Sequence, residues 1–192
     1  MRKLLITGFD PFDGASINPA WEAVKLLPDV VGDFVLCKIE IPTVYGKAAQ
    51  MVLAAAEEVK PDVILCIGQA GGRAAVTPER IAVNIRDARI ADNEGNQPVG
   101  EYVVDGAPAA YFSTVPVKAM AEAVTSAGYP GMVSNSAGTF VCNDTLYILL
   151  HHFAGSATGV GFIHVPYLPE QGTPSLSLEY TVAALSAAIA VC

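Results

Sequence analysis

The chain alternates short, almost continuously apolar runs with longer runs in which apolar residues recur every three or four positions. Segments 3–9 and 62–68 are nearly all apolar and reach a glycine at their ends, which is typical of strands buried on both faces of a parallel sheet. Segment 34–41 alternates more regularly. Segments 132–136 and 159–168 are further candidate strands.

Longer amphipathic runs lie between these candidate strands. Asn18-Pro19 and Thr173-Pro174 each combine a capping residue with a proline suited to the first helical turn, so each predicts a helix start. Pro61 predicts a helix stop. The predicted helices cover residues 18–27, 45–60, 117–128 and 173–191.

The alternation of strands and helices predicts a single α/β domain over residues 1–192, with a mixed or mostly parallel central sheet covered by helices on both faces. Segment 69–114 interrupts this pattern. Residues 80–90 alternate as a strand would, and residues 101–106 are its expected hairpin partner. We therefore expect a β-hairpin excursion near residues 80–105, and such excursions often carry function.

Composition and charge narrow the classes of partner. The chain is 52% hydrophobic and 16% charged, and its net charge is −8. These values place it outside the disordered class and give no indication of a nucleic-acid or anionic-membrane partner. The apolar stretches 4–6 and 180–192 are too short for a signal-peptide core or a membrane span. We therefore expect a cytoplasmic protein. In that reducing compartment the four cysteines, which lack metal-site spacing, should be free thiols.

Cys142 stands where small and β-branched residues give way to a helical pattern. The free N–H groups and partial positive charge of a helix N-terminus favour a thiolate and can stabilise an oxyanion. A cysteine that only packs in the core would occupy the same position. Cys142 is therefore either a nucleophile or a packing cysteine. The apolar stripe that predicts the helix consists of Leu146, Leu149, Leu150 and Phe153.

A nucleophilic cysteine needs a histidine base, and the chain has three histidines. His151 and His152 fall at the end of the predicted helix, where favourable interaction with the helix dipole is their ordinary role. His164 lies at the end of an apolar strand, at the sheet edge where α/β proteins bind ligands. His164 is therefore the candidate base.

Glycine-containing segments also follow two of the predicted strands. Neither 8–14 nor 68–73 matches a dinucleotide or P-loop motif, so nucleotide binding is not indicated. Glu79 lies shortly after the second segment. Its carboxylate would hold the imidazole of a catalytic histidine. Alternatively it forms an ordinary surface ion pair with Arg73 or Arg80, and spacing alone does not decide.

Six segments, in order from near residue 5 to near residue 171, resemble the pyrrolidone-carboxylate peptidases (pyroglutamyl peptidase I), a family of cysteine exopeptidases. The segments are "ITGFDPFDG", "GQAGGR", "ERIAVN", "DARIADN", "SAGTFVCN" and "FIHVPYLPEQ". The resemblance implies a twisted α/β sheet of the phosphorylase/hydrolase-like kind and a cytoplasmic enzyme. It also implies removal of an N-terminal pyroglutamyl residue from peptides, assembly as a homotetramer, and no metal or organic cofactor.

The resemblance also assigns roles to residues. It implies that Cys142 is the nucleophile, that His164 is the general base and that Glu79 orients the histidine. The implied substrate-binding residues are Phe9 and Phe12 beside the lactam ring, Gln69 through backbone hydrogen bonds, Phe140 and Val141 as apolar wall, and Arg89 near the oxyanion.

Two positions depart from the family pattern. Asp13 stands where the family usually has glycine, and Arg86 stands where it more often has an uncharged or acidic residue. Two other functions are compatible with such a fold, because fold does not determine function. One is a nucleoside phosphorylase-like transferase, and the other is a non-catalytic binding protein that kept the pocket.

Overall fold

The computed structural model describes all residues, 1–192. The strands are Arg2–Phe9 (β1), Val30–Val31 (β2), Phe34–Ile41 (β3), Val63–Gln69 (β4), Thr77–Pro78 (β5), Ile81–Val83 (β6), Ala110–Phe112 (β7) and Gly159–Val165 (β8). The helices are Pro19–Leu26 (α1), Lys47–Val59 (α2), Val117–Ser126 (α3), Val141–His152 (α4) and Leu178–Ile189 (α5). None of these helices has the length and apolar character needed to cross a membrane.

Six strands form one sheet in the order β2-β3-β1-β4-β8-β5. The four central strands are parallel, and β2 and β5 pair antiparallel at the two edges. The prediction of a mixed, mostly parallel sheet is therefore confirmed.

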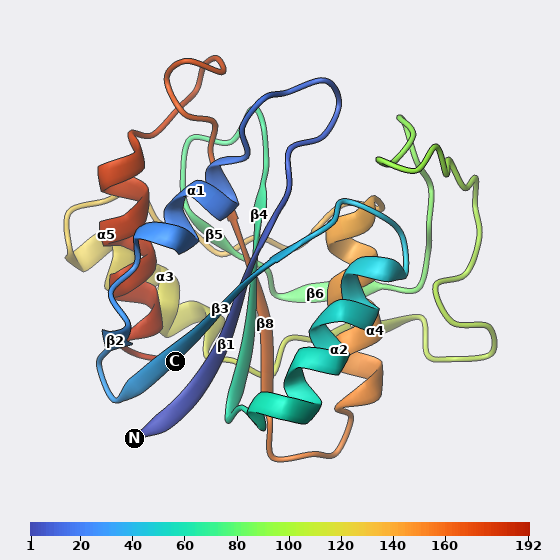
Figure 1. The fold of residues 1–192 in the computed structure, drawn as a ribbon, viewed down its shortest axis with the longest axis horizontal. Coiled ribbons are helices and arrows are strands. Elements are labelled where there is room, and N and C mark those ends of the chain that lie inside the picture. Colours follow the sequence, from blue (N-terminus) through green and yellow to red (C-terminus); the bar gives the residue numbers. More distant parts are fainter.

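Helices cover both faces of this sheet, with α1, α3 and α5 on one face and α2 and α4 on the other (Figure 1). Successive side chains of a strand point to opposite faces. Leu4 and Ile6 of β1 accordingly pack in the core beneath the first group of helices, whereas Leu5 packs beneath the second group. The uninterrupted apolar runs of the sequence reflect this burial on both sides.

The two helix starts predicted from a capping residue and a proline have different outcomes. The Asn18 side chain caps α1, as predicted. The final helix does not begin at Thr173-Pro174 but at Leu178. The Ser177 side chain accepts a hydrogen bond from a backbone N–H of the first turn, which satisfies a donor that would otherwise be free. Ser177, and not Thr173, is therefore the N-cap of α5.

The predicted hairpin near residues 80–105 is not confirmed as a continuous pairing. β6 has three residues, and its antiparallel partner is β7 rather than 101–106. Within 80–105 a single antiparallel bridge joins Arg86 and Glu101. The Asn143 side chain of α4 bonds both the N–H and the carbonyl of the last β6 residue, at 2.9 and 2.8 Å. The Asn143 side chain therefore satisfies the backbone groups on the edge of β6 that faces away from β7.

Segment 132–136 is not a strand. Isolated parallel bridges join Val76 to Gly131 and Glu79 to Ser134. The neighbouring strand β5 has only two residues, which is too short to support a continuous ladder on this side. The segment nevertheless lies against Glu79.

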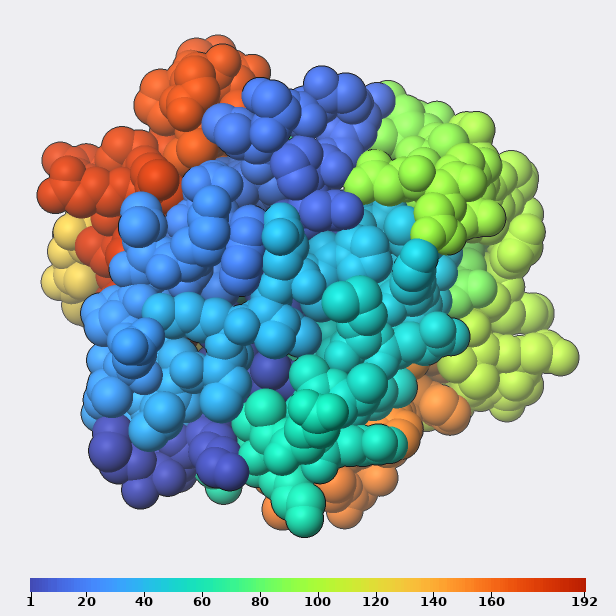
Figure 2. All heavy atoms as spheres, in the orientation of Figure 1, coloured from blue at the N-terminus to red at the C-terminus, as the bar shows by residue number.

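Residues 84–108 lie on one flank of the molecule, against the loop that follows β1 (Figure 2). The Asn93 amide donates to Asp10 Oδ1 at 3.1 Å and to the Pro11 carbonyl at 2.9 Å. Its backbone N–H donates to the Thr43 carbonyl at 3.0 Å. The excursion is thus tied to two loops at the carboxyl edge of the sheet.

Gly8 in β1 allows α1 to approach the sheet closely. A Cβ at this position would lie 2.5 Å from the backbone Cα of Trp21, so we expect Gly8→Ala to destabilise the fold by about 2 kcal/mol. Urea unfolding measures this loss. Gly159→Ala is the control, because its Cβ would meet the nearest atom at 3.4 Å, an ordinary contact. An unchanged midpoint for Gly8→Ala would contradict the prediction.

Candidate active site

A pocket of about 410 Å³ lies where the ends of β4 and β8 meet the first turn of α4. Cys142 and His164 both line it, although 22 residues separate them in the sequence. Glu79 lies behind His164 and has no exposed surface. Five of the six substrate-binding residues predicted from the sequence also line this pocket: Phe9, Phe12, Gln69, Arg89 and Phe140.

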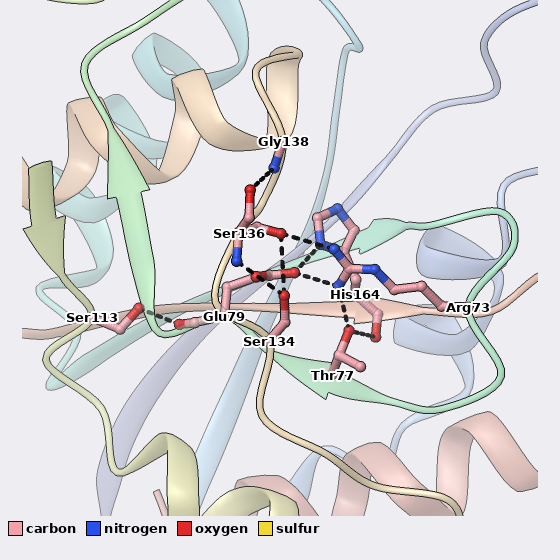
Figure 3. Close-up of polar contacts among 8 residues, drawn as sticks. All are labelled: Arg73, Thr77, Glu79, Ser113, Ser134, Ser136, Gly138 and His164. Atoms are coloured by element: carbon pink, nitrogen blue, oxygen red, sulfur yellow. Dashed lines mark hydrogen bonds and ion pairs between the residues drawn. The ribbon is translucent and has the colours of Figure 1, made fainter.

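The pairing of β5 with β8 places Glu79 beside His164. Thr77 lies opposite His164 in this antiparallel pair, and the Glu79 N–H donates to the Phe162 carbonyl at 2.8 Å. Residues two apart on a strand share a face, so Glu79 and His164 are diagonal neighbours. Glu79 Oε1 and His164 Nδ1 are 2.7 Å apart (Figure 3). Nε2 is the ring nitrogen left for other partners.

Glu79 also pairs with Arg73, whose Nη1 lies 2.6 Å from the same Oε1. The sequence had offered an orienting carboxylate and an ion pair as alternatives, and the structure contains both contacts. This ion pair is not at the surface, because the Glu79 side chain is 0% exposed. Burial raises the pKa of Glu79, but hydrogen bonds and charge from His164, together with Ser134 and Arg73, hold the pKa below its ordinary value.

Burial lowers the pKa of His164 below its ordinary value. The hydrogen bond and negative charge of Glu79 oppose this shift, and the positive charge of Arg73 adds to it. His164 is therefore a neutral imidazole at pH 7, and it has the protonation state that a general base needs.

Cys142 lies in the first turn of α4 as predicted, but its thiol is not a ready thiolate. Burial raises the pKa of Cys142 to about 12, and the charge of Glu79 adds to this shift. The backbone N–H of Cys142 and the charge of Arg73 act in the opposite direction and are outweighed. The helix N-terminus alone therefore does not ionise the thiol, and a base must take its proton.

Gly68 makes room for the thiol. It pairs with His164 across β4 and β8, and a Cβ at Gly68 would lie 3.0 Å from Cys142 Sγ and 2.7 Å from the Phe162 ring. Only glycine leaves space there for the start of α4 to approach the sheet. Gly68, the last residue of the apolar run 62–68, is thus required for the close approach of Cys142 and not only for the strand.

Aromatic rings form the apolar wall of the pocket. The rings of Phe12 and Phe140 are 6.1 Å apart, and Tyr45 meets Phe140 edge-on at 5.5 Å. Val141 does not belong to this wall. It is the first residue of α4, and its side chain is fully buried in the core between α4 and the sheet.

Several pocket residues were not predicted. Ala70 and Gly71 belong to the glycine-containing segment 68–73, which the sequence had already marked. Asn18 was predicted only as a helix cap, and Thr43 gave no signal, since both reach the pocket through tertiary folding. The unpredicted lining residues are Asn18, Thr43, Ala70, Gly71, Arg73, Ala137 and Gly138.

The two departures from the family pattern have separate structural roles. Arg86 Nε lies 2.6 Å from Oδ1 of Asp144, a buried residue of the first turn of α4. The other oxygen of Asp144 accepts from the Gly46 N–H at 2.8 Å. Arg86 therefore ties the excursion to the helix that carries Cys142. Asp13 adopts a φ of 53°, in the left-handed region that glycine favours, and this explains the usual glycine there.

The edge of this α/β sheet holds a thiol, an imidazole and a buried carboxylate together. This set of groups is typical of the thiol-dependent hydrolases. The family model described as pyroglutamyl peptidase matches residues 2–192. The chain belongs to the pyroglutamyl peptidase family.

Relatives and solved structures agree with this assignment. The pyrrolidone-carboxylate peptidase of Levilactobacillus brevis is 53% identical, over 97% of this chain and 95% of its own. That of Brevibacillus brevis is 48% identical, over 98% and 92%. The crystal structure of Bacillus amyloliquefaciens pyroglutamyl peptidase I matches with a TM-score of 0.96 at 45% identity, over 100% of this chain and 96% of that chain.

The lowered pKa of His164 predicts how stability depends on pH. The unfolded chain binds a proton near pH 6.5, whereas folded His164 binds it only at lower pH. The stabilisation is therefore complete above pH 6.5 and is lost as pH falls from there toward the folded pKa, by at most about 1.4 kcal/mol per pH unit. Urea unfolding between pH 7 and pH 5 measures the slope. The slope of the free energy of unfolding against pH should decrease in His164→Gln. It should stay unchanged in His152→Gln, whose side chain is exposed. Equal slopes in all three proteins would contradict a lowered pKa of His164.

Proposed function

We propose that this protein is a cysteine exopeptidase that removes an N-terminal pyroglutamyl residue from peptides. One observation carries the proposal: Cys142 and His164 line one pocket, with Glu79 bonded to the histidine. Membership of the pyroglutamyl peptidase family supports the choice of substrate.

In the proposed reaction, Cys142 Sγ attacks the carbonyl carbon of the pyroglutamyl bond while His164 Nε2 takes the thiol proton. Glu79 stabilises the imidazolium that results. The N–H of Cys142 at the start of α4 and the Arg89 side chain stabilise the oxyanion. His164 then protonates the leaving amine as the C–N bond breaks. Water, deprotonated by His164, hydrolyses the thioester and restores the thiol.

The pocket suits a neutral lactam ring. Phe12 and Phe140 offer apolar surface on which a flat ring can pack, and a charged N-terminal amine would lose hydration there without a counterion. A neighbouring cavity of about 650 Å³ shares Phe12, Gln69 and Arg89 with the pocket. We assign this cavity to the part of the peptide that follows pyroglutamate.

The alternative of a nucleoside phosphorylase-like transferase is not favoured, because the matching family and relatives are peptidases. Two further parts of the proposal come from the family resemblance, namely a cytoplasmic location and a homotetramer. Four cysteines without a disulfide support a reducing compartment. The exposed apolar side chains of Val99, Tyr102 and Phe112 support contact between copies, and light scattering tests it.

Cys142→Ala should fold like the wild type and release no fluorophore from a pyroglutamyl amide, because only the nucleophile is lost. The wild type should lose its turnover after treatment with iodoacetamide. Cys37→Ala is the control, since Cys37 is a free thiol that does not line the pocket, and it should keep full activity. Turnover in Cys142→Ala would refute the mechanism. A folded, reduced wild type without turnover would favour the non-catalytic binding protein.

Glu79→Gln should retain more activity than Cys142→Ala. The amide keeps a hydrogen-bond partner for His164 but loses the charge that stabilises the imidazolium, so kcat should fall by roughly 10²- to 10⁴-fold. Steady-state kinetics and a thermal melt are measured together. Folded Glu79→Gln with wild-type kcat would exclude Glu79 from the reaction.

A further inference from the structure

The guanidinium group of Arg73 joins three segments around the site (Figure 3). Nη1 donates to Glu79 Oε1 at 2.6 Å and to Thr77 Oγ1 at 2.7 Å, and Nη2 donates to the Ser136 carbonyl at 2.9 Å. Arg73 itself closes the turn 70–73 after β4. One side chain thus connects that turn, the Glu79 segment and the loop that leads to α4.

The loops that Arg73 connects form part of the pocket. Ala70 and Gly71 line it from the turn after β4, and Ala137 and Gly138 line it from the loop before α4. A fork of donors on a planar group fixes its partners in distance and in direction, which a single point charge does not. Arg73 therefore sets the position of two pocket walls as well as the position of Glu79.

Charge is the second part of the argument. A carboxylate without exposed surface needs a positive partner. Two groups bond to Glu79 Oε1: Arg73, which is always charged, and His164, which is charged only when protonated. Because Arg73 supplies the permanent charge, Glu79 remains a carboxylate while His164 stays neutral. Without Arg73, the protonated histidine would be the only counterion left.

We propose that Arg73 is a positioning residue of the reaction, which compensates Glu79 and thereby keeps His164 free to accept the thiol proton. This inference rests on the proposed function, in which His164 is the base. The charged and titratable groups that face His164 are Glu79 from the segment after β5, Arg73 from the turn after β4, and the Cys142 thiol from α4. Gly68, its partner on β4, has no side chain.

The test compares Arg73→Gln, which loses both charge and fork, with Arg73→Lys, which keeps the charge only. Arg80→Gln is the matched control, because Arg80 lies next to Glu79 in the sequence and its side chain makes no ion pair. Kinetics use a fluorogenic pyroglutamyl amide across pH. Proton NMR follows the imidazole of His164, which is assigned among three histidines by its loss in His164→Gln.

In Arg73→Gln we expect kcat to fall roughly 10- to 100-fold with KM changed less than about threefold, since a misplaced catalytic group costs turnover more than binding. The acidic limb of kcat/KM and the NMR titration of His164 should both move to higher pH, by about 0.5 unit or more. Arg73→Lys should keep the wild-type titration but lose part of kcat. Arg80→Gln should match the wild type.

A wild-type kcat together with an unchanged His164 titration in folded Arg73→Gln would overturn the inference. If Arg73→Gln does not fold, Arg73→Lys decides, because a wild-type kcat in that variant would exclude the role of the fork and a shifted His164 titration would exclude the role of the charge. The NMR titration needs no substrate. A wild type without pyroglutamyl turnover would therefore refute the proposed function, while the titration would still test what Arg73 does to His164.

Discussion

A carboxylate with no exposed surface has to find its partners within the protein, and at Glu79 those partners come from β8 and from the turn after β4. This requirement explains several otherwise unrelated features. β5 pairs with β8 in a register that puts Thr77 opposite His164, so Glu79, two residues further on, projects from the same face as His164. The turn after β4 folds back so that its last side chain reaches the carboxylate. The Glu79 carboxylate therefore connects β8 with the turn after β4 at this edge of the sheet.

Burial at this edge also moves the pKa values of Cys142 and His164 in opposite directions. Burial moves the pKa of Cys142 up and that of His164 down, so the resting pair is a thiol beside a neutral imidazole. An uncharged pair is compatible with an apolar pocket, because no unpaired ion has to be desolvated there. In the proposed reaction, charge develops on the pair only while a substrate is present, and Glu79 already lies where the positive charge would form.

Local patterns predicted most of the sheet and helices. The apolar runs located β1, β4 and β8 within one residue at their starts, because strands buried on both faces carry a strong signal. The alternating segment 34–41 located β3, which is partly exposed. The patterns failed in two ways. The partner of β6 is set by tertiary folding, which brings β7 beside it, whereas 101–106 meets 80–90 at one bridge. The start of the last helix was misplaced for a local reason, because Ser177 rather than Thr173 caps it.

At the site, too, local patterns predicted some residues and missed others. Cys142 and His164 were predicted because each stands at a boundary between elements, and both line the pocket at the sheet edge. Arg73 was seen only as a possible surface partner, since nothing in its local sequence says that Glu79 is buried. The raised pKa of Cys142 was also hidden. Helix position is readable from sequence, but burial of the thiol depends on Gly68 and Phe162 from other strands.

The pair of Arg86 and Asp144 has a consequence for evolution. Asp144 is fully buried two residues after Cys142, and Arg86 lies in the excursion on another part of the chain. Loss of Arg86 alone leaves the buried Asp144 carboxylate without its cation, whereas loss of both together is tolerated far better. The two positions are thus expected to change in step as lineages diverge. A protein engineer who grafts the excursion from a relative would have to carry residue 144 with it.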